Sequence, residues 1–341
     1  MSIREQPHLP YVVVVADFAQ LQPLSGGGSC WYHCQEMTSV QLETVYRSSD
    51  KEHLQFLERI RGRQPSRADL VEYYGTRHWK GYTLRECVAY GMELEVLKGK
   101  PFVWLCATNR GATEVCEEAL SLHGISRADL GWGYLCDPTA KSELRIVAKP
   151  GVYVRLTRNN DKVRGFVNGA VGRIEESLHG NAVFTVRLVG SGVLVLVSPM
   201  AEGGSVFLPC VYGWATTIRR AQGASIAHGV VYSNQKFYAA PRGYGYVAVS
   251  RFRTRDGVYA YGKLRRTDYL PVREPAEDEL LYRSELSESD ASSVASTAEL
   301  EDAKVWSECC SEASDDSDSI WTKACLGAGD PAVYECENDE I

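Results

Sequence analysis

A buried strand that leads directly into a helix, at residues 102–124, constrains the fold of this 341-residue chain more than any other feature. Residues 102–107 form a continuous apolar run, which is typical of a strand covered on both faces. Thr108 or Asn109 can cap the helix that follows, and Gly124 can end it. A strand followed at once by a capped helix predicts an α/β domain.

Turn residues recur at short intervals after Gly151. Strand-like segments cover residues 152–156, 170–175, 183–188 and 193–197, with asparagine- and glycine-containing turns between them. Short strands joined by such turns predict a small antiparallel β-barrel. Helices and strands then alternate again toward the C-terminus, so we expect the barrel to be inserted within the α/β domain.

The N-terminal part of the chain contains two further predicted elements. Residues 11–15 are an apolar, valine-rich run, which predicts a buried parallel strand. Only ten residues precede this run, so we expect its domain to begin upstream, in a longer gene of which this sequence is a part. Ser49 with Glu52 three residues later matches a capping box and predicts a helix over residues 50–61.

The charge of the chain is divided between a basic body and an acidic tail. Residues 274–341 hold 20 Asp and Glu and 3 Lys and Arg, whereas residues 1–273 hold 34 basic and 24 acidic residues. A basic body is compatible with a polyanionic partner or with plain solubility. The tail is poor in large apolar residues, so we expect disorder there. Its Trp306 and Trp321 could dock a protein partner or have no role.

Neither cysteines nor apolar runs indicate an extracellular or membrane protein. The 11 cysteines show no paired zinc-ligand spacing, which favours reduced thiols inside the cell. The apolar run near the N-terminus is too short for a signal sequence or a membrane span. We therefore expect an intracellular protein with no membrane partner.

Five segments occur in an order that resembles superfamily 1 helicases of the PIF type. The most specific are Ala-Thr-Thr-Ile-Arg-Arg-Ala-Gln-Gly-Ala-Ser at 215–225 and Tyr-Val-Ala-Val-Ser-Arg at 246–251, which match motifs V and VI. Ala-Asp-Phe-Ala-Gln-Leu at 16–21 resembles motif III, although Ala16 stands where the family has glycine. Residues 42–48 resemble motif IV. The fifth segment is the strand, Thr-Asn and helix unit described above, and Val-Asn-Gly at 167–169 resembles the entry to the family's barrel.

The resemblance implies an ATP-driven enzyme that unwinds DNA by moving 5′ to 3′ along a single strand, in genome maintenance, repair and recombination. In such an enzyme ATP and Mg²⁺ bind between two RecA-like domains, and arginines of the second domain meet the γ-phosphate. Arg47 and Arg251 match those arginines. Gln20 matches the residue that senses the γ-phosphate, and Asp17 the acid beside it. Apart from the resemblance, either arginine could simply pair with a carboxylate, and Asp17 could cap a turn.

The resemblance also implies a surface for single-stranded DNA. Thr108 and Asn109 match residues that touch the DNA backbone, where contacts position the strand without reading its sequence. Motif V couples the nucleotide to that strand, and here Arg219 stands where the family has histidine. Arg158, Lys162 and Arg164 could extend the basic surface or lie in a solvated turn. The motif V residues that match the family are Thr217, Gln222, Gly223 and Ser225, and Arg219 could still reach a phosphate in place of the histidine.

The sequence lacks the phosphate-binding loop of such an enzyme. No Gly-x-x-x-x-Gly-Lys-Ser/Thr occurs, and the Asp-Glu pairs lie only in the acidic tail. We therefore expect this chain alone not to bind ATP well or to hydrolyse it. Two other functions stay open, which are a non-enzymatic single-strand-binding remnant and an interaction protein acting through its tail. A nuclear or other DNA-containing compartment fits all three.

Together these features predict an α/β, RecA-like second motor domain with an inserted barrel, a remnant of the first motor domain and a disordered acidic tail. The predicted boundaries are 1–40 for the remnant, 41–150 and 206–273 for the second RecA-like domain, 151–205 for the barrel and 274–341 for the tail.

Overall fold

The computed structural model describes residues 15, 17, 19–21, 40, 45–233 and 240–272. Most of the strand predicted at residues 11–15 lies outside these ranges, as do Ala16 of motif III and the acidic tail. In the described ranges, no helix combines the length and apolarity that crossing a lipid bilayer requires.

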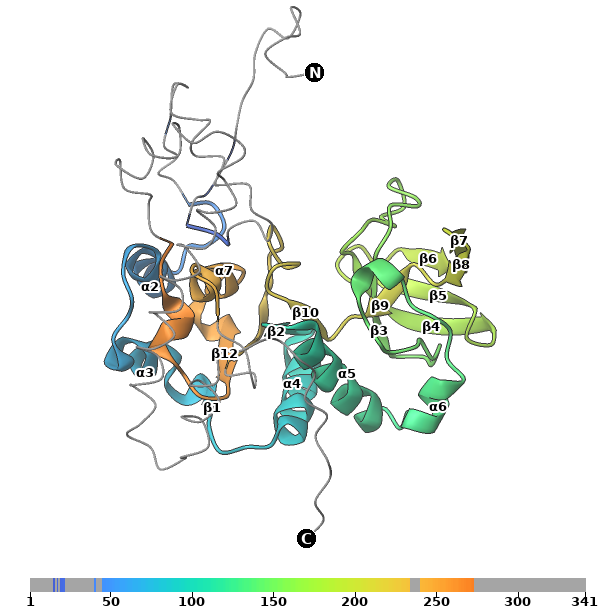
Figure 1. Cartoon of the computed structure of the whole chain (residues 1–341), viewed down its shortest axis with the longest axis horizontal. Coiled ribbons are helices and arrows are strands. Elements are labelled where there is room, and N and C mark those ends of the chain that lie inside the picture. The colour runs from blue at the N-terminus through green and yellow to red at the C-terminus, as the bar shows by residue number, and fades with distance from the viewer. Residues whose placement is uncertain are drawn as a thin grey trace, which may run out of the picture. The chain divides into compact units, whose positions relative to one another are not determined.

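A five-stranded parallel sheet forms the centre of the α/β part (Figure 1). The strand at residues 102–107 is confirmed as β2, and both of its neighbours in the sheet come from residues 215–232, more than 100 residues later in the sequence. An α/β fold is therefore confirmed. In spatial order the strands are β1 (His78–Trp79), β12 (Val258–Tyr261), β11 (His228–Tyr232), β2 (Phe102–Cys106) and β10 (Ala215–Thr217).

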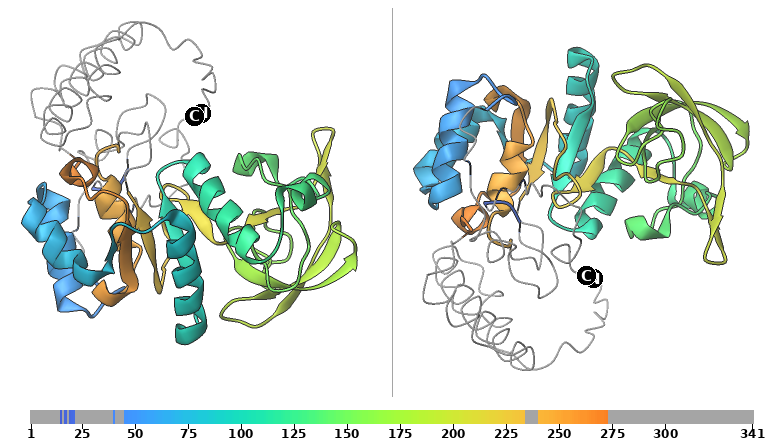
Figure 2. Two further views of the ribbon diagram at one scale, coloured as in Figure 1. Left: turned by 90° about the horizontal axis from the view of Figure 1, so that it is seen from below. Right: turned by 90° about the horizontal axis from the view of Figure 1, so that it is seen from above.

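Side chains alternate between the two faces of this sheet, so each face has its own core. Trp104 and Cys106 of β2 pack into one cluster with α4 and α5, whereas Leu105 packs into another with α2, α3 and α7. Figure 2 shows these helices on opposite sides of the strands. The helices are α2 (Lys51–Gly62), α3 (Arg67–Tyr74), α4 (Leu84–Lys98), α5 (Asn109–Leu122), α6 (Arg127–Gly131) and α7 (Tyr244–Ser250), with 3₁₀ turns at Gly75–Arg77, Pro138–Ala140, Arg255–Gly257 and Arg266–Tyr269.

The helix predicted at residues 50–61 is present, but its predicted cap is wrong. Asp50, rather than Ser49, is the N-cap of α2, and its Oδ1 accepts a hydrogen bond of 3.1 Å from the backbone N–H of His53. Asp50 takes this position because its other oxygen accepts a bond of 2.7 Å from the N–H of Arg255. A long-range contact therefore decides where the helix begins.

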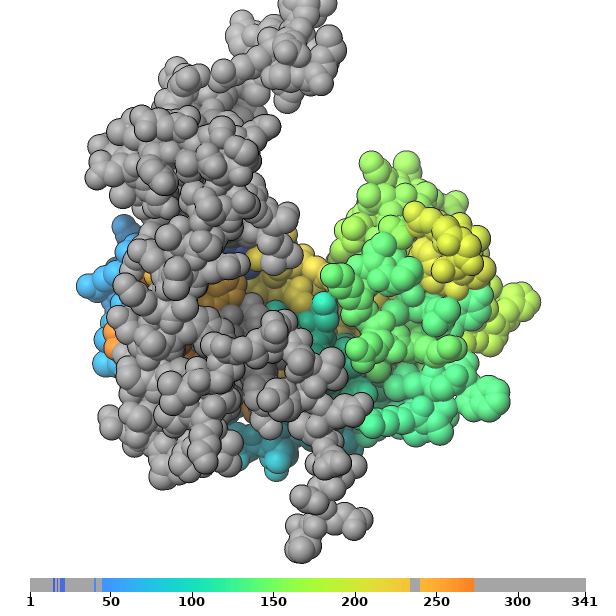
Figure 3. All heavy atoms as spheres, viewed as in Figure 1, coloured from blue at the N-terminus to red at the C-terminus, as the bar shows by residue number. Residues whose placement is uncertain are grey.

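A second, antiparallel sheet lies between α5 and β10 in the sequence. Its order is β6-β5-β4-β3-β9, and the end strands β6 and β9 do not pair with each other among the described residues. Closure into a barrel and the domain boundaries therefore stay predictions. Figure 3 shows this region in green and yellow. The strands are β3 (Tyr153–Leu156), β4 (Val171–His179), β5 (Val183–Leu188), β6 (Leu194–Val197) and β9 (Cys210–Tyr212), with a separate hairpin of β7 (Met200–Glu202) and β8 (Ser205–Phe207).

Both sheets share one hydrophobic core. Phe102 and Trp104 of the parallel sheet belong to the same cluster of buried residues as Val154 and Tyr212 of the antiparallel sheet. Trp214, which lies between β9 and β10, stacks on Tyr212 with ring centroids 5.8 Å apart. The antiparallel sheet is thus packed onto the end of the parallel sheet next to β10.

Candidate functional site

The predicted DNA-contacting residues gather where two neighbouring parallel strands end. Thr108 and Asn109 follow β2, and Thr217 is the last residue of the adjacent β10. The carboxyl ends of parallel strands are where ligands bind in open α/β sheets, since loops and helix N-termini converge there. The structure therefore brings together residues from two motifs that are far apart in the sequence.

Thr108, one of the two caps that the sequence predicted, forms the N-cap of α5. Its Oγ1 accepts a hydrogen bond of 3.1 Å from the backbone N–H of Gly111. Asn109 is the first residue of the helix and lines a cavity with Thr217. The positive end of the α5 dipole lies beside the side chains of Thr108 and Asn109, which suits a site for an anion.

The motif V residues after β10 form a compact turn. The N–H of Ala221 bonds to the carbonyl of Thr217 at 3.0 Å, and the N–H of Gln222 bonds to that of Arg219 at 3.3 Å. Gly223 has a φ of +85°, a conformation that favours glycine. Ser225 is exposed and Gln222 half-buried. The Gln222 Nε2 lies 3.5 Å from the Gln20 Oε1, so the turn meets the motif III segment.

Asp17 ties the motif III segment to two helices. Its Oδ2 accepts hydrogen bonds from the side-chain amide of Gln20 at 3.2 Å and from the hydroxyl of Tyr246 at 3.1 Å. Its Oδ1 is 3.3 Å from the guanidinium of Arg61 on α2. Asp17 also caps its own turn through the N–H of Ala19 at 3.2 Å, so the turn-capping alternative is present together with the long-range contacts.

Arg47 and Arg251 lie next to each other at the C-terminal end of α7. Arg47 is exposed and donates a hydrogen bond of 3.0 Å to the carbonyl of Ser250, the residue before Arg251. Arg251 is only 2% exposed and donates to the carbonyl of Val247 and the hydroxyl of Ser250. Burial and the like charge of Arg47 lower the pKa of Arg251. Neither arginine forms an ion pair with a carboxylate among the described residues.

A cleft at the carboxyl ends of the parallel strands is lined by positively charged side chains that were not predicted as site residues from the sequence. It has a volume of about 280 Å³, and Lys141, Arg155 and Arg220 line it beside Asn109 and Thr217. None of its described lining residues is acidic. Arg155 stands out in the sequence only as a charged residue inside the apolar run of β3.

Arg158 is one of the three basic residues that we expected either on the DNA surface or in a solvated turn. Instead, its side chain forms ion pairs. Its guanidinium lies 3.0 Å from the carboxylate of Asp137, whose side chain is fully buried, and 2.8 Å from that of Glu202. Arg164 pairs with Asp161 at 3.7 Å. Arg158 therefore supports the antiparallel sheet, because a buried carboxylate needs a partner of opposite charge.

Curated relatives of the chain are helicases. The chain is 24% identical over 269 residues to the ATP-dependent DNA helicase PIF1 of Xenopus laevis, a match that covers 72% of this chain and 40% of the relative. It is 24% identical over 298 residues to the PIF1 helicase of Danio rerio, covering 81% of this chain and 43% of that protein. The chain is therefore similar to PIF1-type helicases. It spans less than half the length of these two relatives.

The fold agrees with this relationship. A crystal structure of the Bacteroides Pif1 helicase in complex with ADP-AlF3 and single-stranded DNA matches with a TM-score of 0.50 and 18% identity, covering 72% of this chain and 57% of that one. The parallel sheet and its helices are thus of the RecA-like kind found in PIF1-type helicases. No family model matches the chain.

The two arginines predicted to contact a nucleotide fit a polyanion in their charge, but only Arg47 is exposed. Arg47 and Arg251 supply two like charges side by side, which an anion of high charge would stabilise. Arg251 would have to leave its bonds to Val247 and Ser250 before it could reach such an anion. Magnesium ligands are not evident, since no group of three His, Cys, Asp or Glu side chains gathers among the described residues.

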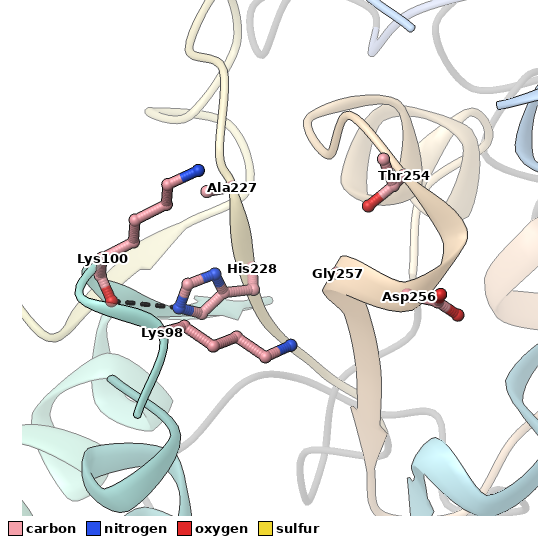
Figure 4. A pocket seen from close by; sticks show the side chains of 7 residues that line it. All are labelled: Lys98, Lys100, Ala227, His228, Thr254, Asp256 and Gly257. Carbon is pink, nitrogen blue, oxygen red and sulfur yellow. Dashed lines mark hydrogen bonds between the residues drawn. The ribbon is translucent and has the colours of Figure 1, made fainter. Parts of the chain in front are cut away.

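A second cavity, of about 330 Å³, lies at the opposite edge of the parallel sheet (Figure 4). His228 begins β11 there and its Nε2 is 3.0 Å from the carbonyl of Lys100. Burial, followed by the charges of Lys98 and Lys100, lowers the pKa of His228. None of the residues with PIF1-like motif positions lines this cavity, so we assign it no function.

Proposed function

We propose that residues 41–150 and 206–273 form the second RecA-like motor domain of a PIF1-type DNA helicase, and that this domain binds single-stranded DNA. The observation that carries the proposal is the convergence of Thr108, Asn109 and Thr217 at the ends of two adjacent parallel strands. The Bacteroides relative was crystallised with single-stranded DNA. Contacts of this kind hold the phosphate backbone, so binding should be independent of sequence.

The test is binding of a fluorescein-labelled oligothymidylate, measured by anisotropy over a range of NaCl concentrations. The 341-residue protein should bind it with an affinity that falls as salt rises, because binding releases counterions. Asn109→Ala should weaken binding, whereas Gln55→Ala, at an exposed position on α2, should not. Absence of salt-dependent binding by the wild-type protein would exclude this function.

ATP and Mg²⁺ belong to the complete enzyme in this proposal, and Arg47 and Arg251 supply positive charge to the triphosphate there. Gln20 and Asp17 connect the nucleotide to the DNA surface through Gln222. The chain described by this sequence has no Gly-x-x-x-x-Gly-Lys-Ser/Thr to cradle the phosphates, so it should not hydrolyse ATP by itself. Phosphate release stimulated by single-stranded DNA from the pure 341-residue protein would contradict this.

The direction of movement and the cellular role follow from the same proposal. The complete enzyme would move 5′ to 3′ on single-stranded DNA and act in genome maintenance, in a DNA-containing compartment. Unwinding assays with 5′- and 3′-tailed duplexes, using a protein extended to include the first motor domain, would test the direction.

The separation of charge in the sequence favours a second candidate function. Residues 274–341 carry an excess of 17 negative charges and the remainder an excess of 10 positive charges. The acidic segment could occupy the DNA surface and so compete with nucleic acid. Removal of residues 274–341 should then tighten binding of the oligothymidylate, and unchanged affinity would rule this candidate out.

A further inference from the structure

The cleft at the carboxyl edge contains an arginine whose charge is not balanced by its surroundings. Arg155 lies on β3, between Val171 of β4 and Val211 of β9 in the sheet register. Its Nη2 is 3.3 Å from the carbonyl of Gly213, while its buried Nε has no hydrogen-bond partner among the described residues. A buried donor without a partner costs free energy, and a ligand that accepts a hydrogen bond from it would remove that cost.

None of the described residues that line the cleft beside Arg155 is acidic, and Asp137 lies outside the lining. Burial lowers the pKa of Arg220, and the charge of Asp137 acts in the opposite direction. The carboxylate of Asp137 is already engaged by Thr139, by Thr157 at 2.7 Å and by Arg158 at 3.0 Å. Burial raises the pKa of the Cys116 thiol to about 12, so this neighbour is neutral at neutral pH. Burial, and after it the charge of Arg220, lower the pKa of Arg155 to about 10. The two guanidinium groups therefore repel each other across the cleft, and a shared anion would relieve both costs.

The lining of the cleft indicates what kind of anion it takes. Thr139, Thr157 and Thr217 line the cleft together with the two arginines, and Asn109 lies there at the N-terminus of α5. At about 280 Å³ the cleft has room for a phosphate group. Because Asn109 and Thr217 belong also to the proposed DNA surface, a phosphate held here would be part of the same strand.

We propose that Arg155 and Arg220 together hold one backbone phosphate of the bound single strand in the cleft between α5, β10 and β3. This subsite rests on the DNA-binding function proposed above and extends the DNA contact from the parallel sheet onto the first strand of the antiparallel sheet. Arginine is suited to it because its planar fork can bond to two phosphate oxygens at once.

The test uses the 341-residue protein and the labelled oligothymidylate in a NaCl titration. Arg155→Met keeps the side-chain volume but removes the charge, so it should weaken binding roughly tenfold and reduce the salt slope by about 0.7, which corresponds to one lost phosphate contact. Arg220→Gln should act in the same direction, and Arg155→Lys should restore most of the slope. Arg187→Gln is the control, because Arg187 pairs with Glu175 on an exposed part of β5.

The outcomes separate this subsite from DNA binding in general. If the wild type binds but Arg155→Met has the wild-type slope and an unchanged melting temperature, the subsite is wrong and the proposed function stands. If the wild type does not bind the oligothymidylate, both are wrong. Inorganic phosphate could also stabilise the wild-type protein. If Arg155→Met binds DNA like the wild type but is no longer stabilised by phosphate, the cleft binds a free anion, which also overturns the subsite.

Discussion

The hydroxyl of Tyr246 donates a hydrogen bond of 3.1 Å to the carboxylate of Asp17, and so joins the motif III segment to the helix that ends at motif VI. Burial, with a smaller contribution from Asp17, raises the pKa of Tyr246 to about 12. The hydroxyl therefore keeps its proton at physiological pH and can donate it to Asp17 in a hydrogen bond. Because Asp17 also meets Arg61 and Gln20, one half-buried carboxylate holds three segments together.

Tyr246→Phe should lower the free energy of unfolding by about 1 kcal/mol, since it removes one partly buried hydrogen bond and leaves the ring in place. Urea denaturation followed by circular dichroism would measure this difference. Tyr82→Phe is the matched control, because Tyr82 is 61% exposed, and its effect should stay within about 0.5 kcal/mol. Equal effects of the two substitutions would show that the contact with Asp17 does not stabilise the fold.

Arg251→Met should change the free energy of unfolding by less than about 1 kcal/mol, even though Arg251 is almost fully buried. The cost of burying its charge beside Arg47 offsets the two hydrogen bonds that it donates to Val247 and Ser250. Arg77→Met provides the comparison, because Arg77 bonds to the carbonyls of Tyr73, Tyr74 and Arg255 and should cost about 2 kcal/mol. If Arg251→Met lowers the free energy of unfolding as much as Arg77→Met does, Arg251 stabilises the fold and this prediction is wrong.

Local sequence patterns were sufficient for the elements that depend on neighbouring residues. The strand at β2 and its Thr108 cap follow from a continuous apolar run and a side chain that reaches the next turn. The four strands between Gly151 and Val197 follow from turn residues in the same way. Where a distant residue decides the outcome, the pattern failed, as it did at Asp50, whose second oxygen bonds to Arg255.

The candidate site was predictable only as far as its motifs extend. Residues of the motifs were found in the sequence, but nothing in it places Arg155 beside Arg220, because these residues meet only when the antiparallel sheet packs next to β10. Arg158 was misjudged for the same reason. Its partner, Asp137, caps a 3₁₀ turn that begins at Pro138, and the sequence does not show that this carboxylate becomes buried beside Arg158 in the tertiary fold.

Gly229→Ala should destabilise the α/β part by about 3 kcal/mol or more. Gly229 lies on β11 opposite Val103 of β2, and a Cβ added there would come within 1.9 Å of the Val103 carbonyl oxygen. Backbone atoms of a central strand cannot move aside without loss of their ladder bonds. Gly62→Ala at the end of α2 meets nothing within 4 Å and should be neutral or stabilising by up to about 1 kcal/mol. Thermal unfolding of both variants would check this contrast.

Stability should fall as the pH drops below about 6.5, in part because of His53. This residue is fully buried between the hydroxyl of Tyr73 at 2.7 Å and the carbonyl of Phe252 at 3.2 Å. Burial is the largest cause that lowers its pKa, and the charge of Arg77 adds to it, whereas the contacts with Phe252 and Asp50 act in the opposite direction.

The sign of the effect follows from proton binding in the two states. The folded pKa of His53 is below its ordinary value, so the unfolded chain takes up a proton first as the pH falls. The contribution of His53 to the free energy of unfolding is fully present above about pH 6.5. Below that pH it decreases by at most about 1.4 kcal/mol per pH unit. Urea denaturation between about pH 7.5 and about pH 5.5 should show a smaller loss for His53→Gln than for the wild type. His179→Gln, at an exposed position on β4, should keep the wild-type slope, and an unchanged slope in His53→Gln would remove His53 as a source of the pH dependence.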